Sequence, residues 1–241
     1  MEMDRTSINK ARSVYYGMFA SLFAFNFNES HHDSIIAAVN VLAEHPMDEE
    51  SGMALKAMIQ QLEALTFEGL KNEGNQIFFS PTTSHVPMTA SFYDEKRDDG
   101  KKRVAMMNYV LNSNYRRNTD IFKENEDHIE FIALFLKTLI EEEIKGQEYA
   151  QCLAREVFEQ ILNPMIDTLS EKVFNHENSL FYKNAAIVLR SFAEFERLFL
   201  NVSRPAVSAY DEIAGPDIKA RKVKKPPRQL VERNVEEFVS I

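Results

Sequence analysis

One stretch of the sequence sets acidic residues and a histidine directly against a dense apolar run, in ENEDHIEFIALFLKTL at residues 124–139. Carboxylates such as Glu124 and Asp127 can pair with arginine in charge-assisted hydrogen bonds. Asp127 followed by Glu130 also fits a capping box, in which Asp127 would contribute about 1 kcal/mol to a helix start. Capping does not account for His128, because the positive end of a helix disfavours a protonated histidine. The pattern indicates a recognition site at a helix start, with pure capping as the alternative.

Signatures of catalysis and metal binding are missing from the sequence. It has no glycine-rich phosphate loop, no His-Glu-x-x-His and no Gly-x-Ser-x-Gly. His31 and His32 are adjacent, and adjacent helical side chains diverge by about 100°, which makes a poor chelate. Cys152 is the single cysteine, which excludes an internal disulfide and a multi-cysteine metal site; a lone helical cysteine is typical of a buried hydrophobe. We therefore expect no cofactor, no metal and no enzymatic activity.

Composition and charge limit the class of protein. The 241 residues are 44% hydrophobic and 27% charged, which is ordinary for a globular protein with a sizeable core. The net charge of −9 argues against nucleic-acid binding. The start of the sequence lacks a basic segment followed by an apolar one, and no apolar run approaches about 18 residues. We expect no secretory signal, no membrane span and a cytoplasmic location.

Apolar residues recur mostly at three- and four-residue spacing, and the chain has only 7 Gly and 8 Pro, so helices are favoured over strands. An irregular stretch at residues 75–87 interrupts this helical spacing. It predicts a hinge or a binding loop that contains Phe78 and Phe79. The pattern predicts an all-α chain. Its first helix is capped by Ser7, a further helix is opened by Pro164, and a charged break lies at 94–103. The other expected helices cover residues 33–44, 49–70 (ended by Gly74), 147–162 and 180–200.

The last part of the sequence has a different composition. Six basic residues and no acidic residue lie between Lys219 and Arg228, around Pro226 and Pro227. Such a segment cannot form a buried core, so residues 206–241 are expected to be a basic, proline-containing tail. The final QLVERNVEEFVSI regains a short amphipathic stripe, which we expect to dock on the chain itself, a second copy or a client. A tail that touches nothing is the alternative.

Two blocks of the sequence together resemble the signature of the TorD/DmsD family of redox-enzyme maturation chaperones. The first is an acidic residue, a spacer, Asp-His and a Phe-bearing apolar helix, with Asn125 where the family often has Pro. The second lies in PMTASFYDEKRDDG, and NSLFYKNAAIVLRSFAEF resembles the closing helix of the family. The family's Trp-rich region is absent, and Phe78 and Phe79 stand nearest to it. The matching positions are Glu124, Asp127, His128 and Phe131 in the first block and Pro87, Ser91, Tyr93 and Gly100 in the second.

This resemblance implies a single globular helical bundle of the TorD/DmsD type over residues 1–205. It also implies a cytoplasmic chaperone that binds the twin-arginine leader and the apo form of a molybdenum-containing oxidoreductase, and supports cofactor insertion before export. The client enzyme is open, and so is a homodimer. For leader and client binding, the resemblance indicates Asp127, His128, Glu124, Pro87, Ser91, Tyr93, Phe78 and Phe79.

Two other classes of function remain as alternatives at this point. A helical regulatory or scaffolding adaptor would have the same composition but no specificity for a leader. A helical enzyme is least supported, because no nucleophile and base can be paired in the sequence.

Overall fold

Helices make up nearly all the regular structure of the computed structural model, which describes residues 4–205. Within these residues the one β-type pairing is an isolated antiparallel bridge between Thr89 and His128, so the all-α prediction is confirmed. The helices are α1 (Arg5–Leu22), α2 (Glu29–Glu44), α3 (Glu49–Ala64), α4 (Phe67–Phe78), α5 (Ala90–Glu95), α6 (Lys101–Leu111), α7 (Ile129–Ile144), α8 (Glu148–Val157), α9 (Asn163–Asn175) and α10 (Phe181–Leu200).

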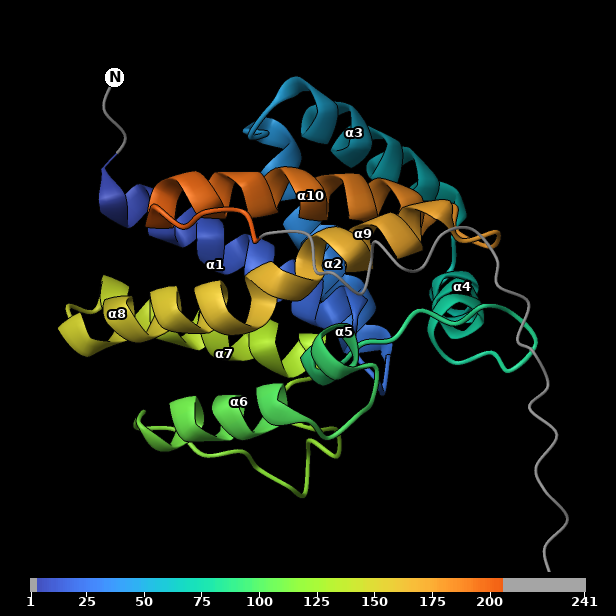
Figure 1. Ribbon diagram of the computed structural model, residues 1–241. Helices are drawn as coiled ribbons and strands as arrows, with labels where there is room; N and C mark the ends of the chain where they lie inside the picture. The colour runs from blue at the N-terminus through green and yellow to red at the C-terminus, as the bar shows by residue number, and fades with distance from the viewer. Residues whose placement is uncertain (1–3, 206–241) are drawn as a thin grey trace, which may run out of the picture. The chain divides into compact units, whose positions relative to one another are not determined.

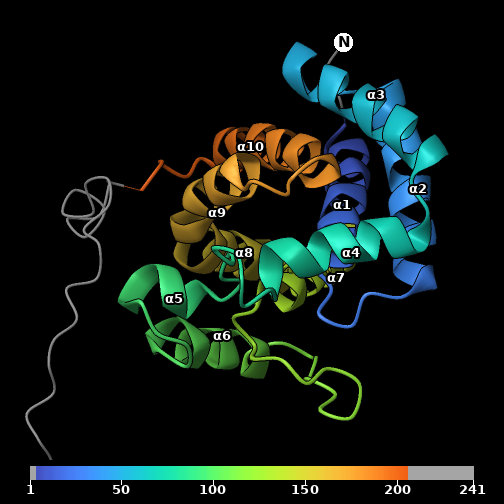
Figure 2. The same cartoon turned by 90° about the vertical axis from the view of Figure 1, so that its right-hand side faces the viewer.

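The core forms around α1 and α10, two long helices with wide apolar faces. Helix α1 packs along α7 and α2, while α10 packs along α9 and α3. The Phe192 ring meets the rings of Tyr15, Tyr16 and Phe19 at centroid distances of 4.9, 4.9 and 5.5 Å, and these aromatic contacts join the two helices. Figures 1 and 2 show α5 and α6 on the side of α7 and α8 that faces away from α3. None of the helices in the described part of the chain is both long and apolar enough to cross a bilayer.

A buried ion pair reinforces the contact between α1 and α10. Arg12 and Glu196 have side-chain exposures of 1% and 0%, and the Arg12 Nη2 donates to Glu196 Oε2 at 2.8 Å. The Tyr16 hydroxyl donates to the same carboxylate oxygen at 2.9 Å, and Asn9 Oδ1 accepts from Arg12 Nη1 at 2.8 Å. Because both charges are paired and hydrogen-bonded, the pair is tolerated in the core, but loss of either partner would leave a buried charge.

Pro164 explains why the chain changes helix type between α8 and α9. A five-residue π-helix, Phe158–Leu162, joins the two helices. Proline has no N–H, so it cannot donate to the carbonyl of Gln160 four residues earlier. The Lys102 Nζ donates to that carbonyl at 2.7 Å instead. The expected helix start at Pro164 is therefore real, although the chain passes into it without a break.

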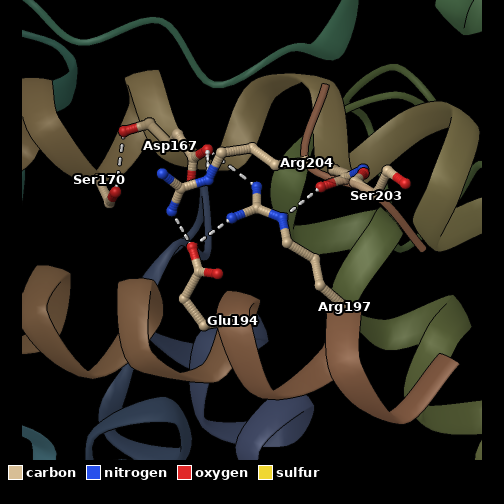
Figure 3. A network of polar contacts seen from close by, with 7 residues as sticks. Asp167, Ser170, Glu194, Arg197, Ser203 and Arg204 are labelled. Carbon is tan, nitrogen blue, oxygen red and sulfur yellow. Dashed lines mark hydrogen bonds and ion pairs between the residues drawn. The ribbon is translucent and has the colours of Figure 1, made fainter. Parts of the chain in front are cut away.

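Two arginines, Arg197 in α10 and Arg204 in the segment that follows it, pair with carboxylates of α9 and α10. Figure 3 shows Arg197 and Arg204 converging on Glu194 and Asp167. Arg197 Nη1 donates to Glu194 Oε1 at 2.7 Å, Arg197 Nη2 donates to Asp167 Oδ2 at 2.9 Å, and Arg204 also pairs with both carboxylates. The expected tail at 206–241, with its basic run and amphipathic segment, lies outside the described residues.

The predicted helix over 49–70 is wrong, because the chain breaks at Leu65. The Thr66 side chain accepts the N–H of Gly69 at 3.2 Å and caps a new helix, α4. Gly74 does not end this helix but lies inside it. A Cβ at Gly74 would lie 3.1 Å from the Tyr182 hydroxyl, so glycine allows α10 to approach closely.

The predicted irregular stretch at 75–87 also begins too early. Helix α4 continues through residues 75–78 and includes Phe78, and Phe79 is its C-cap. The irregular connection therefore runs from Phe79 to Thr89, where α5 is about to begin. The apolar residues Ile77 and Phe78 complete the buried face of α4, which is why the helix extends through them.

Three smaller predictions need correction. Helix α1 begins at Arg5 after Asp4 rather than at Ser7. Helix α2 begins at Glu29 rather than Asp33, because Asn28 and His31 form a capping box in which each side chain accepts the other's backbone N–H. Cys152, predicted to be buried, lies on the exposed side of α8.

Candidate functional site

The two sequence blocks that carry the family resemblance lie side by side at the starts of α5 and α7. The Ile129 N–H donates to the Met88 carbonyl at 2.8 Å, and the Ala90 N–H donates to the Asp127 carbonyl at 2.9 Å. The bridge between Thr89 and His128 lies between these two bonds. The backbone of each block therefore satisfies hydrogen-bonding groups of the other.

Asp127 caps α5 rather than α7, which corrects the predicted capping box with Glu130. Its side chain is fully buried, and its Oδ2 accepts the N–H of Ser91 at 2.8 Å in the first turn of α5. The N-cap of α7 is His128, whose Nδ1 accepts the N–H of Glu130 at 3.3 Å. Position 128 thus does the capping that the sequence pattern assigns to position 127.

His128 is neutral in this position, which resolves the objection to a histidine at a helix start. Only 2% of the residue is exposed, and burial lowers the pKa of His128 to about 4. With Nδ1 accepting a hydrogen bond, the ring carries its proton on Nε2. Nε2 is buried and has no hydrogen-bond partner among residues 4–205.

Ser91 and Tyr93 hold the two blocks in place through hydrogen bonds. Ser91 is fully buried, and its hydroxyl accepts the N–H of Arg103 at 3.2 Å. The Tyr93 hydroxyl donates to the Pro87 carbonyl at 2.8 Å, and burial raises the pKa of Tyr93 well above its ordinary value. A Cβ at Gly100 would lie 3.1 Å from the Ser91 Cβ, so glycine lets the start of α6 approach α5. These residues fix the geometry of the two blocks.

A cavity of about 290 Å³, here called the acidic cavity, lies beside the joined blocks, between the end of α4, the start of α5 and the start of α7. Of the residues that the sequence predicts for the site, the ones that line it are Phe78, Phe79, Pro87, Glu124 and His128. Ser91, Tyr93 and Asp127 do not line it. The structure adds residues that the sequence interpretation missed, among them Phe25, Met88, Phe92 and Asp98.

Exposed aromatic rings form one lip of the acidic cavity. The Phe25 and Phe79 rings meet edge to face at a centroid distance of 5.2 Å, and the two residues remain 42% and 40% exposed. Phe78, in contrast, is only 6% exposed, and its ring contacts those of Phe23 and Tyr182. Phe79 and Phe25 are therefore the rings available to a ligand, while Phe78 belongs mainly to the core.

Two carboxylates, Glu124 and Asp98, give the cavity its negative charge. Burial and the nearby charge of Asp98 raise the pKa of Glu124. Asp98 Oδ1 accepts the Thr89 hydroxyl at 2.7 Å. Within residues 4–205 neither carboxylate has a lysine or arginine at ion-pair distance, whereas the nearby Glu95, Asp99 and Glu126 do. The cavity therefore presents uncompensated negative charge next to aromatic rings.

Glu130 links the aromatic lip to α7. Its Oε2 accepts the backbone N–H of Phe25 at 2.9 Å, and burial raises the pKa of Glu130 to about 7. Glu130 thus holds the segment after α1 in place and does not pair with Asp127. An acidic residue inside the apolar run HIEFIALF was the available signal for a special role. Asp98 had no comparable signal, because it lies in a run of charges that reads as a solvent-exposed break.

Comparison with known protein families agrees with the resemblance. A family model described as the nitrate reductase delta subunit matches residues 44–171, slightly more than half of the chain. The chain belongs to this family. The match to the nitrate reductase delta subunit family includes both joined blocks and the acidic cavity's two carboxylates, and it confirms the TorD/DmsD resemblance. The family consists of maturation chaperones for redox enzymes rather than catalysts, so we describe this member as a redox-enzyme maturation chaperone.

Comparison with solved structures supports the same fold. The chain resembles the crystal structure of a candidate redox enzyme maturation protein from Archaeoglobus fulgidus, with a TM-score of 0.52 and 19% sequence identity. The alignment covers 80% of this chain and 96% of the other. A search of curated proteins found no match.

Proposed function

We propose that this member of the nitrate reductase delta subunit family is a cytoplasmic chaperone that binds the twin-arginine leader of a molybdenum-containing oxidoreductase. The acidic cavity holds the arginine pair, and the chaperone retains the apoenzyme until its cofactor is inserted. The observation that carries the proposal is the pair of uncompensated carboxylates, Asp98 and Glu124, beside exposed aromatic rings.

The charge of the cavity favours a guanidinium over other ligands. Arginine offers a planar fork of N–H donors that matches carboxylate oxygens, and it is always protonated at neutral pH. A bound arginine would also relieve the repulsion between Asp98 and Glu124, which now contributes to the raised pKa of Glu124. The rings of Phe25 and Phe79 offer faces for cation–π contact with the same group.

The rest of the molecule supports the same class of ligand. The net charge of −9 would speed encounter with a basic peptide. The joined starts of α5 and α7 provide a rigid back wall, because Asp127, Ser91 and Tyr93 are locked by the hydrogen bonds described above. A preorganised wall lowers the entropic cost of ordering the site on binding.

Titration with a labelled leader peptide tests the proposal. The full chain should bind a peptide with the arginine pair and lose about tenfold or more in affinity when both arginines become lysine, since lysine cannot form the bidentate contact. A scaffolding adaptor without leader specificity would bind both peptides alike, and that result would refute the proposal. Purification with the native client, followed by metal and cofactor analysis of that client, identifies the oxidoreductase.

A further inference from the structure

A cavity of about 390 Å³, larger than the acidic cavity, lies between α9 and α10. We call it the α9–α10 cavity. It shares no lining residue with the acidic cavity. The side chains that matter to the argument are Asp167, Glu171 and Phe174 of α9, Ile187 and Arg190 of α10, and Arg204 of the segment that follows α10.

The α9–α10 cavity already holds one guanidinium, that of Arg204. The Arg204 Nε lies 3.5 Å from Asp167 Oδ2, and the Arg204 Nη2 pairs with Glu194 Oε1. Figure 3 shows the Arg204 guanidinium between these two carboxylates, which come from α9 and α10. A planar fork of N–H donors between carboxylates is the geometry in which proteins bind arginine. The chain's own residue thus indicates the chemical class of ligand that fits the cavity.

Arg204 is held less firmly than Arg197, the other arginine of this network. The Arg197 side chain is 4% exposed, lies within α10 and also donates to Asn163 Oδ1 at 2.8 Å. The Arg204 side chain is 61% exposed and lies in the irregular segment after α10. Ion pairs of exposed side chains contribute little to stability. Arg197 is therefore a permanent counter-charge, whereas Arg204 can be replaced by another arginine.

The walls of the cavity also offer acceptors that Arg204 does not use. Asp167 Oδ1 is buried and has no hydrogen-bond partner within residues 4–205. Glu171, one turn further along α9, makes no ion pair in the same part of the chain. Arg190, the second basic lining residue, is paired with Glu50 of α3. An arginine that enters from outside would therefore meet more acceptor atoms than Arg204 does.

Apolar side chains line the cavity beside these carboxylates. Ile187 is half-buried there, and so is Phe174. The Lys183 Nζ lies 4.7 Å from the centre of the Phe174 ring, so one face of this ring already contacts a cation. An apolar residue next to the arginine of a ligand would contact Ile187 and the rest of the Phe174 ring.

From this arrangement we propose that the α9–α10 cavity is a second arginine-binding site, which Arg204 blocks in the free chain. An arginine of a client segment replaces Arg204 between Asp167 and Glu194, and an adjacent apolar side chain of that segment packs against Ile187. Arg204 is then an internal competitor that sets the affinity of the site. The inference does not depend on leader recognition by the acidic cavity, because the two sites share no residue.

Four forms of the full chain and two peptides test this inference. All four proteins carry Asp98→Asn/Glu124→Gln, so that the acidic cavity does not contribute. One has no further change, one adds Arg204→Gln, one adds Arg204→Gln/Asp167→Asn, and a control adds Arg5→Gln. Arg5 is 48% exposed and pairs with Glu143, so its loss changes the net charge as the loss of Arg204 does. The labelled peptides contain leucine beside either arginine or citrulline, which has a similar shape but no charge.

The Arg204→Gln form should bind the arginine peptide about tenfold more tightly than its parent, which corresponds to Arg204 occupying the site about nine-tenths of the time. The citrulline peptide should show no gain, the Arg5→Gln control should bind as the parent does, and the added Asp167→Asn should remove the gain. Unchanged affinity in the Arg204→Gln form, an equal gain for citrulline or a gain that survives Asp167→Asn would overturn the inference.

Thermal melts separate this account from a purely structural role of Arg204. A lower melting temperature of the Arg204→Gln form without any gain in affinity would mean that Arg204 only fastens the end of α10, and would overturn the inference. If Asp167→Asn prevents folding because Asp167 also pairs with Arg197, Glu171→Gln takes its place. Glu171 is exposed, and its neutralisation should reduce the gain severalfold. An undiminished gain would then exclude the α9–α10 cavity as the site.

Discussion

Asp127 accepts the backbone N–H of Ser91 at 2.8 Å, and through this bond a residue at the start of α7 caps α5, 36 positions earlier in the chain. The bond is fully buried at both residues. It joins the two sequence blocks that characterise the family and fixes the back wall of the acidic cavity. Its loss should therefore affect folding as well as ligand binding.

Substitution Asp127→Ala should lower the free energy of unfolding by roughly 1–3 kcal/mol, because the Ser91 N–H would be buried without a partner. Asp127→Asn keeps an acceptor oxygen and should cost less. Urea denaturation of the three proteins at pH 7.5 measures both effects. Equal midpoints for the Ala variant and the unaltered chain would contradict the role of Asp127 as the cap of α5.

His128 should make the folded chain less stable at low pH. Its pKa falls from 6.5 to about 4 on folding, so the unfolded chain binds the proton more tightly. The stability that His128 contributes is fully present above pH 6.5 and is lost as pH falls through 4, with a total of roughly 3 kcal/mol. His128→Asn keeps a capping oxygen without a titrating ring. Denaturation at pH 8 and pH 4.5 should show the unaltered chain losing stability relative to this variant, and a constant difference would refute the neutral, buried histidine.

Glu130 should have the opposite effect and make the folded chain less stable at high pH. Its pKa rises from 4.5 to about 7 on folding, so the folded chain binds the proton more tightly. Its contribution is fully present below pH 4.5 and is lost as pH rises through 7. Glu130→Gln retains an acceptor for the Phe25 N–H and cannot ionise, so it should gain roughly 1–2 kcal/mol relative to the unaltered chain between pH 4.5 and pH 8. Denaturation curves across this range check the gain, and parallel curves for the two proteins would contradict it.

The buried pair Arg12–Glu196 should matter far more than an exposed pair. Glu196→Gln removes the close, hydrogen-bonded counter-charge of the buried Arg12 and leaves only Glu143, at 4.0 Å, so it should cost about 3 kcal/mol. The control is Glu50→Gln, which breaks a pair with Arg190 whose side chains are 53% and 50% exposed, at a cost below about 1 kcal/mol. Thermal and urea unfolding compare the two variants. Similar losses in both would mean that Arg12 finds another partner or water.

Local sequence signals predicted the helices best where the apolar stripe is long and uninterrupted. The expected helix at 180–200 agrees with α10, and the charged break at 94–103 separates α5 from α6. The break at Leu65 was not predictable from periodicity, because apolar spacing continues through Leu70. The end of the helix at Leu65 depends on the Thr66 cap and on how α4 packs.

The site was predictable only in part, for a similar reason. Glu124 and His128 stand out by residue type at a helix start, and both line the acidic cavity. Ser91, the hydrogen-bond partner of Asp127, lies 36 positions away in the sequence, so the local pattern assigned Asp127 to the wrong helix. Asp98 becomes notable only when the fold places it beside Glu124, because the two charges then affect each other.

The most direct test of leader recognition by the acidic cavity is a double-mutant cycle between ligand and protein. Calorimetry would measure a leader with its arginine pair, and the same leader with two glutamines, against the unaltered full chain and an Asp98→Asn/Glu124→Gln variant. An Asp33→Asn/Glu44→Gln variant, altered at two exposed positions on α2, controls for the same change in net charge. The arginine-to-glutamine change should cost the unaltered chain and the control about tenfold or more and should cost the Asp98→Asn/Glu124→Gln variant almost nothing, a coupling of at least about 1.4 kcal/mol. An equal loss in all three proteins would show that the arginine pair binds elsewhere, and would contradict the account.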